Sequence, residues 1–418
     1  MSSIPSLNSL IPSEEYSMQY SSVDEAIQHI LQAGAGAWLA KVDIADAFKL
    51  LPIHPQLWKY YGIQWADKFY FANRLTFGSK SSPWLFEQLA KALHWILIHH
   101  GGLSRVVHYL DDFLLIERPS QVPSIPHSLL DIFSRLQVPV ATAKTEGPAT
   151  KVTFLGIILD TIKMEASLPS EKLLRIRSAI SRAVQSHFLT RAELQSLLGM
   201  LNFASRIMPQ GRAFLSRLLC LLPSAPEQDS VVHLDGQAFA DLDMWSRFLS
   251  DWNGISLFVP QWDSSSPMVF SDAAGSSGFA AIFRSHWLAA GWPLELVADT
   301  AALKSSPLLE LYPIVAAAQV WGHHWANSSV TFVTDSQTLV DIVNKGRAQS
   351  PRIMALLRKL VWLSLLHNFH MRCVHISGEQ NRAADALSRA NFAVFFQEMP
   401  DADQSSTPVP QFSTLILA

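Results

Sequence analysis

The sequence predicts an α+β and α/β multidomain protein in which a helical segment separates the two parts. Three observations lead to this fold class. The chain has 418 residues, 49% hydrophobic and only 16% charged, so it can bury two or three cores. Residues 170–222 follow a helical pattern. After residue 268, strands come first and then alternate with helices, which is typical of an α/β layer.

The first part of the chain opens with a polar, Ser-rich stretch and continues with short apolar runs. Two of these runs flank Leu110–Asp112 and indicate a β-hairpin. The elements expected before residue 165 are helices over Val23–Gln32, Pro83–His99 and Ser128–Leu136, and strands over Trp38–Asp43, Phe69–Phe71, Val106–Tyr109, Phe113–Ile116 and Lys151–Leu159.

The helical segment carries a capping box and a local excess of positive charge. Thr190 and Glu193 have the spacing of the box, and leucines follow on one helix face. Between Glu171 and Arg217 there are eight Lys or Arg against two acids, whereas the formal net charge of the chain is −3. The net charge argues against nucleic-acid binding, so this segment is where we expect phosphate contacts.

The C-terminal part follows a polar linker over Gln261–Pro267, where we place a domain boundary. The tail from Phe392 contains Ser, Pro and Gln and is expected to be loose. The elements expected between linker and tail are strands over Met268–Ser271, Gly278–Phe283, Val330–Thr334 and Phe369–Ile376, and helices over Leu308–Ala326, Ser336–Asn344, Ile353–His367 and Ala383–Ser388.

Cysteine usage and hydropathy exclude several classes of protein. The two cysteines, Cys220 and Cys373, lie far apart and predict neither a disulfide framework nor a cysteine zinc site. The N-terminus has no basic region followed by a long apolar run, and the longest apolar stretches are too short to span a bilayer. We therefore expect an intracellular protein, in the cytoplasm or the nucleus, without a signal peptide or a membrane-spanning segment.

Three aspartates of the first part form a pattern that suits divalent metal ions. Asp43 ends an apolar strand, and Asp111 and Asp112 lie side by side at the hairpin. Neighbouring carboxylates repel each other, and a cation such as Mg²⁺ removes that cost. Two ions about 3.5–4 Å apart can activate a 3′-hydroxyl and stabilise a leaving pyrophosphate. The alternative for an isolated Asp-Asp pair is a solvated turn.

Four acids of the C-terminal part form a second pattern of this kind. Asp272 and Asp335 each end a strand, whereas Glu310 and Asp385 lie on helices. Such residues can converge on one face of a sheet and hold two metal ions suited to cutting a phosphodiester with water. Taken singly, each acid is better explained as a cap or a surface residue.

The run Lys41–Leu159 resembles the reverse transcriptase palm of retroelements. Asp43 matches the metal-binding aspartate of its first motif, Tyr109–Asp112 resembles its Y-x-D-D box, and Phe154–Gly156 resembles the entry to its primer grip. The order of these three motifs is that of the family, which favours the metal site over the solvated turn. The resemblance implies catalytic and metal-binding roles for Asp43, Asp111 and Asp112.

Further residues of this run match nucleotide-binding positions of the family. Leu75–Ser79 resembles the L-P-F-G segment that lies against the template and the incoming nucleotide. Phe48 matches an aromatic gate that blocks a ribose 2′-hydroxyl, and core packing explains it equally well. Lys144 matches a lysine near the departing pyrophosphate, and a surface lysine is the alternative. The resemblance thus implies nucleotide binding by Phe48, Phe77, Gly78 and Lys144.

The C-terminal acids resemble those of the ribonucleases H in their order and spacing. The resemblance implies catalytic and metal-binding roles for Asp272, Glu310, Asp335 and Asp385. Gly378 and Glu379 stand where many ribonucleases H have a Gly-His pair, so the histidine thought to help product release is missing.

Together these resemblances imply an RNA-directed DNA polymerase with ribonuclease H activity and two Mg²⁺ ions, or Mn²⁺, in each active site. The implied partners are an RNA template, a DNA primer, an RNA–DNA hybrid and deoxynucleoside triphosphates. The duplex backbone would be held by Lys172, Arg175, Arg177, Arg206 and Arg212.

Several phrases resemble DIRS-like retrotransposons, with gypsy-type elements next nearest. These phrases are His108–Phe113, Leu198–Ala204, Trp321–Trp325 and His367–His370. The predicted domains are 1–40, an N-terminal remnant with truncated fingers; 41–165, the palm; 166–260, the helical thumb or connection; 266–392, the ribonuclease H-like domain; and 393–418, the loose tail.

The alternative to an active enzyme is a decayed or domesticated fragment that binds nucleic acid, with at most the ribonuclease H half active. Residues 1–40 contain no Arg and no Lys, where a fingers subdomain would carry basic residues for the nucleotide. This favours the fragment, whereas the seven intact carboxylates favour the enzyme.

Overall fold

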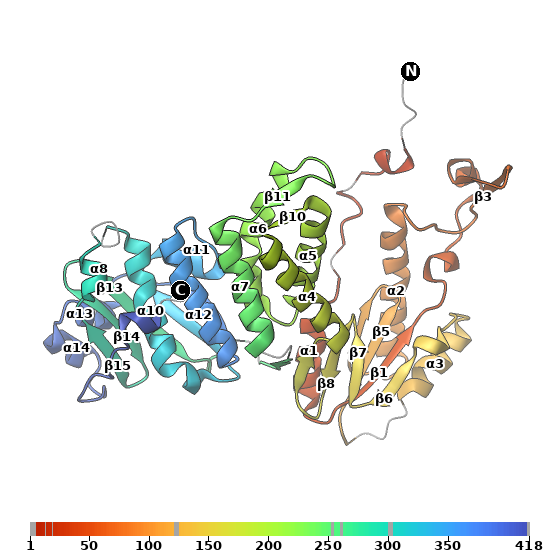
Figure 1. Ribbon diagram of the computed structural model, residues 1–418. Coiled ribbons are helices and arrows are strands. Elements are labelled where there is room, and N and C mark those ends of the chain that lie inside the picture. Colours follow the sequence, from red (N-terminus) through yellow and green to blue (C-terminus); the bar gives the residue numbers. More distant parts are fainter. Residues whose placement is uncertain are drawn as a thin grey trace. The chain divides into compact units, whose positions relative to one another are not determined.

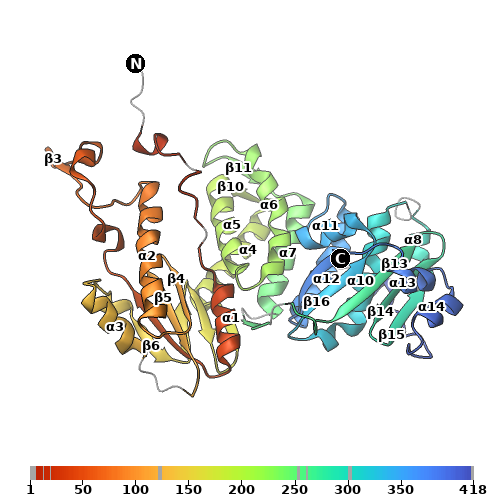
Figure 2. The same ribbon diagram turned by 180° about the vertical axis from the view of Figure 1, so that it is seen from behind.

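The computed structural model describes residues 6–12, 14–18, 20–120, 125–251, 255–259, 262–299 and 304–415. They fall into two compact units, Met1–Ala166 and Ser167–Ala418 (Figures 1 and 2). Gln261, the first residue of the predicted linker, lies outside the described residues, as do 1–5, 13 and 19 of the predicted remnant and 416–418 of the tail. Among the helices described, none is long and apolar enough to cross a membrane.

The first unit is built on a four-stranded sheet with the order β4-β5-β1-β6. Helices α2 and α3 pack on one face, where Val42, Phe113 and Phe133 are fully buried. Helix α1 packs against β5. The elements are α1 (Val23–Ala33), β1 (Trp38–Asp43), α2 (Ser81–His99), β4 (Val106–Tyr109), β5 (Asp112–Glu117), α3 (Ile125–Arg135) and β6 (Glu146–Ala149).

Two hairpins of this unit differ from the sequence prediction. The strand expected over Lys151–Leu159 is wrong as a single element, because the chain turns at Leu155 and Gly156, with φ of 48° and 78°. It forms the antiparallel pair β7 (Lys151–Phe154) and β8 (Ile157–Asp160). The strand expected over Phe69–Phe71 has an unpredicted partner, since β2 (Gly62–Trp65) pairs with β3 (Lys68–Phe71).

The second unit begins with helices that pack around aromatic side chains. Trp245, Phe248 and Phe214 are fully buried between α7 and the turns before α6. The predicted capping box is confirmed, with Thr190 and Glu193 bonded to each other's backbone. The elements are α4 (Ser170–Ser186), β10 (Phe188–Thr190), α5 (Arg191–Ala204), α6 (Ser216–Leu221), β11 (Val231–His233), α7 (Gly236–Asp251) and β12 (Ile255–Leu257), and the boundary between the two units falls within β9 (Glu165–Ser167).

The same unit contains the predicted α/β layer, a five-stranded sheet with the order β15-β14-β13-β16-β17. Strand β14 is antiparallel to both of its neighbours, β13 and β15, whereas β13, β16 and β17 run parallel to one another. The elements are β13 (Met268–Ala274), β14 (Gly278–Phe283), β15 (His286–Ala290), α8 (Leu294–Val297), α10 (Ser306–Trp321), β16 (Ser329–Thr334), α11 (Gln337–Lys345), α12 (Pro351–Leu366), β17 (His370–His375), α13 (Arg382–Ser388), α14 (Phe392–Glu398) and α15 (Phe412–Leu415).

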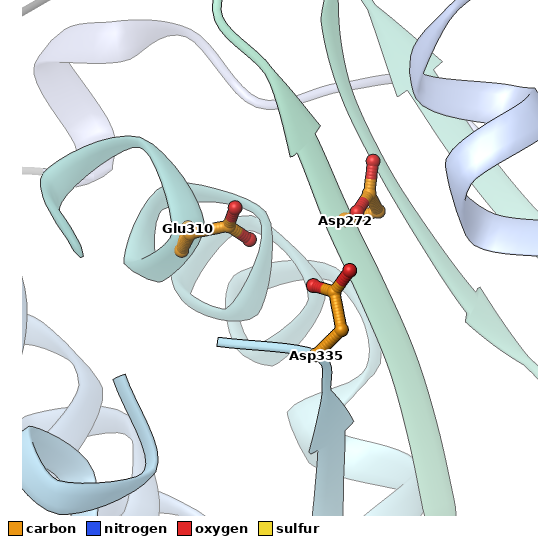
Figure 3. Close-up of side chains that lie close together, drawn as sticks. All are labelled: Asp272, Glu310 and Asp335. Carbon is orange, nitrogen blue, oxygen red and sulfur yellow. The ribbon is translucent and has the colours of Figure 1, made fainter. Parts of the chain in front are cut away.

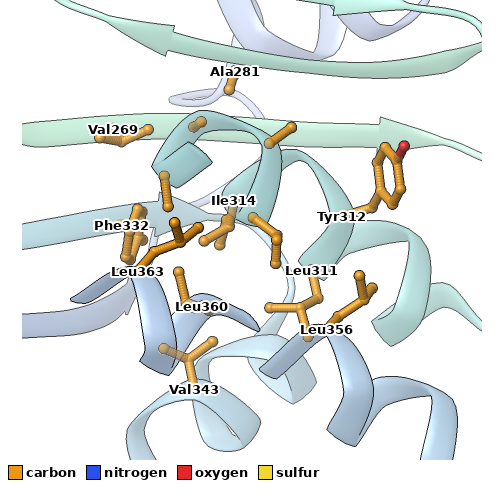
Figure 4. Packing of buried hydrophobic residues seen from close by; sticks show 14 of the residues in the cluster. Val269, Ala281, Leu311, Tyr312, Ile314, Phe332, Val343, Leu356, Leu360 and Leu363 are labelled. Carbon is orange, nitrogen blue, oxygen red and sulfur yellow. The ribbon is translucent and has the colours of Figure 1, made fainter. Parts of the chain in front are cut away.

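Side chains that alternate along β14 supply a core on each face of this sheet. Phe279 and Ala281 face α10, α11 and α12, in the cluster drawn in Figure 4. Ala280 and Ile282 face α13 and α14. Because β14 is buried on both faces, it reads as a continuous apolar run rather than an alternating one.

The expected loose tail is corrected by the structure. Helix α14 buries Phe395 completely against Trp287, with ring centroids 5.4 Å apart. Beyond it, the carbonyl of Asp403 accepts a hydrogen bond of 2.8 Å from Trp287 Nε1. A loose tail was predicted from its Ser, Pro and Gln content. Composition averages over the segment, so the prediction gave no weight to the few aromatic side chains that anchor it.

Candidate active sites

The first three predicted aspartates meet at one end of the first sheet. Tyr109 pairs with Asp112, which leaves Leu110 and Asp111 as a two-residue turn, with Leu110 at a φ of 53°. Asp43 lies directly opposite Asp112 in the register of β1 and β5. The amide of Ile44 donates to the carbonyl of Asp111 at 2.9 Å, which ties the turn to the end of β1.

A pocket of about 510 Å³ opens beside this turn. It is lined by Asp43 and Asp111 together with three of the predicted nucleotide-binding residues, Phe48, Phe77 and Lys144. Phe48 is half-buried, and its ring centroid lies 5.0 Å from that of Phe77, which is 81% exposed. The remaining predicted residues, Asp112 and Gly78, are not among the lining residues; Gly78 has a φ of 89°.

Burial and two neighbouring lysines shift the pKa values of Asp111 and Asp112 at this site. Lys144 Nζ donates to Asp43 Oδ2 at 3.1 Å and to Oδ1 at 3.2 Å, and this bond raises the pKa of Lys144. Burial raises the pKa of Asp111, and it raises that of Asp112 to about 6. Lys41 Nζ, 3.8 Å from Asp112 Oδ1, opposes the shift of Asp112.

The second site brings together three of the four predicted acids (Figure 3). Asp272 lies on β13, Glu310 on α10 and Asp335 directly after β16. Each offers a carboxylate oxygen, and these oxygens all lie within 4.8 Å of one another. Because β13 and β16 are parallel neighbours, residues late in both strands reach the same edge of the sheet.

These three acids fit a divalent cation. Glu310 is 8% exposed, and its Oε2 has no hydrogen-bonding partner among the described residues. Burial, and then the charges of Asp272 and Asp335, raise the pKa of Glu310 to about 8. Burial also raises the pKa of Asp272, although Ser388 donates to it. Carboxylates that are costly to ionise and have spare lone pairs are suited to a hard cation with oxygen ligands.

Asp385 is placed outside this cluster, although it was predicted with it. Its Oδ1 accepts a hydrogen bond of 2.7 Å from Arg389 Nε, one helical turn away. Sequence reasoning missed Arg389, and it also missed Ser388, whose hydroxyl donates to Asp272 Oδ2 at 2.5 Å. Both could have been found from their positions, because residues three and four places after Asp385 lie beside it on a helix.

Lys41 of the first site was also missed, although it lies two residues before Asp43 on the same strand.

The predicted basic residues lie on and after α4 and α5, in different environments. Arg175, Arg206 and Arg212 are exposed. Lys172 places its ammonium 4.0 Å from the ring centroid of Phe203. Arg177 is half-buried and donates through Nε to the carbonyl of Leu249 at 3.0 Å, so its guanidinium already has a partner within the protein.

Two family models match the chain, and they cover different parts of it. Residues 4–159 match the model described as reverse transcriptase (RNA-dependent DNA polymerase). Residues 295–391 match the model described as reverse transcriptase-like.

Retroviral polyproteins are among the similar sequences. The chain is 27% identical over 194 residues to the Gag-Pro-Pol polyprotein of human T-cell leukemia virus 3 (strain 2026ND), which covers 44% of the chain and 13% of the polyprotein. It is 30% identical over 128 residues to the Gag-Pol polyprotein of avian reticuloendotheliosis virus, covering 28% of the chain and 11% of the polyprotein. The chain therefore spans a small part of these relatives.

Foamy viral protease-reverse transcriptases are among the similar solved structures. The one in complex with double-stranded DNA is 18% identical with a TM-score of 0.48, covering 86% of this chain and 60% of that one. The one in complex with an RNA/DNA hybrid is 19% identical with a TM-score of 0.46, covering 85% and 46%. The two family models show that the chain combines a reverse transcriptase domain with a ribonuclease H-like domain, and the sequence matches make it a homologue of retroviral Pol polyproteins.

Proposed function

We propose that the chain is an RNA-directed DNA polymerase that also cuts the RNA strand of RNA–DNA hybrids. The observation that carries the proposal is the presence of two separate carboxylate sites, one within the residues that match the reverse transcriptase model and one with Glu310 and Asp335 within the residues that match the reverse transcriptase-like model. Asp43, Asp111 and Asp112 form one at a sheet end, and Asp272, Glu310 and Asp335 form the other. Both families generally depend on divalent metal ions, and both sets of residues offer the carboxylate oxygens that such ions prefer.

For the polymerase we assign the metal ligands to Asp43 and Asp111, with Asp112 as support and Mg²⁺ as the physiological ion. Bound ions would supply activation of the primer 3′-hydroxyl and neutralisation of the leaving pyrophosphate. Lys144 has an exposed ammonium on the pocket wall and can contact nucleotide phosphates. Phe48 and Phe77 line the same pocket and can pack against the sugar and base of a deoxynucleotide.

For the nuclease we assign Asp272, Glu310, Asp335 and Asp385 as the metal ligands, again for Mg²⁺ with Mn²⁺ as a substitute. The pKa of Glu310 is about 8, so protons compete with a cation for this carboxylate near neutral pH. Ser388 orients Asp272 by its hydrogen bond and so fixes one side of the cluster.

We assign the grip on the duplex to the exposed cations of the helical segment. Arg175, Arg206 and Arg212 are exposed and available to phosphates, and Lys172 lies on α4 with Arg175. Contacts to phosphates carry no sequence information, so binding should be independent of sequence and should weaken as salt is raised.

The test is a pair of assays on the full chain with two reciprocal variants. A labelled RNA–DNA hybrid with Mg²⁺ reports cleavage, and a primed RNA template with deoxynucleotides reports extension. We expect Asp335→Asn to abolish cleavage and keep extension, and Asp111→Asn to do the reverse. Hybrid binding without either reaction would overturn the proposal in favour of a decayed or domesticated binding fragment.

We further propose that the chain derives from a DIRS-like retrotransposon. The proposal rests on the phrases Leu198–Ala204, Trp321–Trp325 and His367–His370, which resemble that group. Sequencing the genomic locus provides the test, because DIRS-like elements carry a tyrosine recombinase. An adjoining integrase gene would instead assign the chain to the gypsy-type elements.

A further inference from the structure

One of the four acids assigned to the nuclease is held apart from the other three by a cation. Asp385 is 43% exposed at its side chain and is paired with Arg389 at 2.7 Å. Asp272, Glu310 and Asp335 form their cluster without it. In the protein without nucleic acid, the carboxylate of Asp385 is therefore bonded to Arg389.

The backbone of Asp385 nevertheless lies beside the cluster. The hydroxyl of Ser388 is within hydrogen-bonding distance of Asp272 Oδ2, at 2.5 Å, and of the Asp385 carbonyl, at 2.9 Å. Ser388 is 3% exposed, so the last turn of α13 is fixed at this place. The carboxylate of Asp385 is close enough for its charge to raise the pKa of Asp272, although it is bonded to Arg389 rather than included in the cluster.

The pairing of Asp385 with Arg389 is of a kind that exchanges easily. Both side chains are substantially exposed, at 43% and 59%, and exposed ion pairs contribute little to stability. Arg389 uses Nε for this contact, and within the described part of the chain its two terminal nitrogens have no hydrogen-bonding partner. A guanidinium with free donors binds phosphate oxygens through two parallel N–H···O bonds.

We propose that Arg389 is a positioning residue that exchanges partners, binding Asp385 in the free protein and a phosphate of the nucleic-acid strand when a hybrid is bound. The exchange releases Asp385 to turn toward Asp272 and complete the metal-binding set. The proposal rests on the nuclease function proposed above and adds an order of events to it.

The exchange makes metal binding and hybrid binding interdependent. A hybrid that occupies Arg389 raises the affinity of the site for a divalent ion, and by thermodynamic reciprocity the ion raises the affinity for the hybrid by the same factor. Without Arg389, Asp385 is free in both states, so the ion binds more tightly to the protein alone and the hybrid adds only what its own phosphate oxygens contribute as ligands.

The experiment measures Mn²⁺ affinity by calorimetry on the full chain, in an Asp111→Asn background that weakens the polymerase site in every sample. Titrations are made with and without a hybrid whose RNA strand carries 2′-O-methyl groups and resists cleavage. In the Arg389→Ala variant we expect Mn²⁺ to bind about fivefold more tightly without hybrid, with the effect of the hybrid reduced by the same factor.

The matched control is Arg382→Ala. Arg382 lies on the same helix with a similar exposure of 60%, and it pairs with Glu398 at 3.2 Å. It should retain both the Mn²⁺ affinity and the hybrid effect of the parent chain. Arg389→Gln keeps a polar donor but no charge and should behave as Arg389→Ala does. Agreement between the two variants shows that the effect does not come from misfolding of one of them.

Unchanged Mn²⁺ affinity in both Arg389 variants, or a hybrid effect as large in them as in the parent chain, overturns the proposal. Cleavage of an unmodified hybrid by the wild-type chain is assayed in parallel and tests the nuclease function separately. If the wild-type chain cleaves the hybrid and the Arg389 variants bind Mn²⁺ as the parent chain does, the exchange is overturned and the nuclease function stands. Absence of both cleavage and Mn²⁺ binding in the wild-type chain overturns the function and the exchange together.

Discussion

At the scale of single residues, Glu310 has the most constrained environment in either site. It is 8% exposed, it faces two other acids, and its Oε2 has no partner among the described residues. A buried carboxyl group in such surroundings favours its neutral form until a cation is present. A metal ion that binds here therefore displaces the proton of Glu310 and relieves the cost of ionising this carboxyl group.

Replacing Glu310 should make the metal-free protein more stable at alkaline pH. Burial raises the pKa of Glu310 in the folded protein to about 8, from the 4.5 that is ordinary for a glutamate. The unfolded chain thus releases this proton first, and the free energy of unfolding falls as pH rises from about 4.5 to about 8. Glu310→Gln should gain roughly 2–4 kcal/mol at pH 8 and little at pH 4.5.

Urea unfolding in EDTA at pH 4.5 and pH 8 measures this difference. Glu295→Gln is the control, because Glu295 is an exposed glutamate of the same unit. A gain that is equal at both pH values would show that ionisation of Glu310 is not its cause.

Lys144 allows a second prediction about single residues. Its ammonium pairs with Asp43 and lines the pocket, so Lys144→Ala should raise the KM for deoxynucleotides and slow extension, together by tenfold or more, about the worth of one charged hydrogen bond. Steady-state extension kinetics measure both constants. Lys151→Ala is the control, since Lys151 pairs with Asp160 in the same unit and is 59% exposed. Equal kinetics for the two variants would remove Lys144 from the nucleotide site.

At the scale of elements, the sequence predicts well those strands, helices and caps that periodicity and neighbouring residues determine. Strand β1 has the bounds that were predicted, because an apolar run ending in Asp43 needs no distant information. The capping box at Thr190 is equally local. The turn at Leu155 was missed because leucine rarely adopts a positive φ, so its presence in the sequence does not indicate a turn.

The site was predictable to the same degree. The order and spacing of the acids marked all seven carboxylates, and their parent strands and helices were expected near the observed positions. The orientation of Asp385 was not predictable, because it depends on the side-chain conformation of Arg389. The raised pKa of Glu310 depends on its burial where α10 packs against β13, which no spacing reveals.

Helix α14 provides a prediction about an element that composition concealed. Phe395 is fully buried against Trp287, so Phe395→Ala should lower the free energy of unfolding of its unit by about 3–5 kcal/mol. Phe392, on the same helix, is 44% exposed, and Phe392→Ala should cost much less. Denaturant titration followed by tryptophan fluorescence measures both. Similar losses in the two variants would mean that α14 is not anchored by Phe395.

At the scale of the whole molecule, the helical segment and the nuclease share one compact unit, Ser167–Ala418. A buried ion pair joins them, in which Arg358 of α12 donates to Asp241 of α7. Arg358 is 5% exposed and Asp241 is 0% exposed. Phe248 of α7 also stacks on Trp362 of α12, with ring centroids 6.1 Å apart.

Breaking this ion pair should damage the unit far more than breaking an exposed one. Arg358→Ala leaves Asp241 buried without its cation and should cost about 3–5 kcal/mol. The double variant Arg358→Met, Asp241→Leu should recover most of that loss, because apolar residues carry no unpaired charge. Arg352→Ala is the control on the same helix, since Arg352 is 54% exposed where it pairs with Asp299. Thermal unfolding of the four proteins gives the order, and a double variant as unstable as Arg358→Ala would contradict the account.

The pairing of Arg358 with Asp241 also bears on how such a chain can be reshuffled during evolution. A recombination event with a junction between α7 and β13 would bring in a foreign nuclease and leave Asp241 facing whatever residue replaces Arg358. Most such chimaeras would carry an unpaired buried charge and would be purged. Crossovers placed before α4 exchange both partners together, so lineages related to this one should inherit the helices and the nuclease as a single cassette.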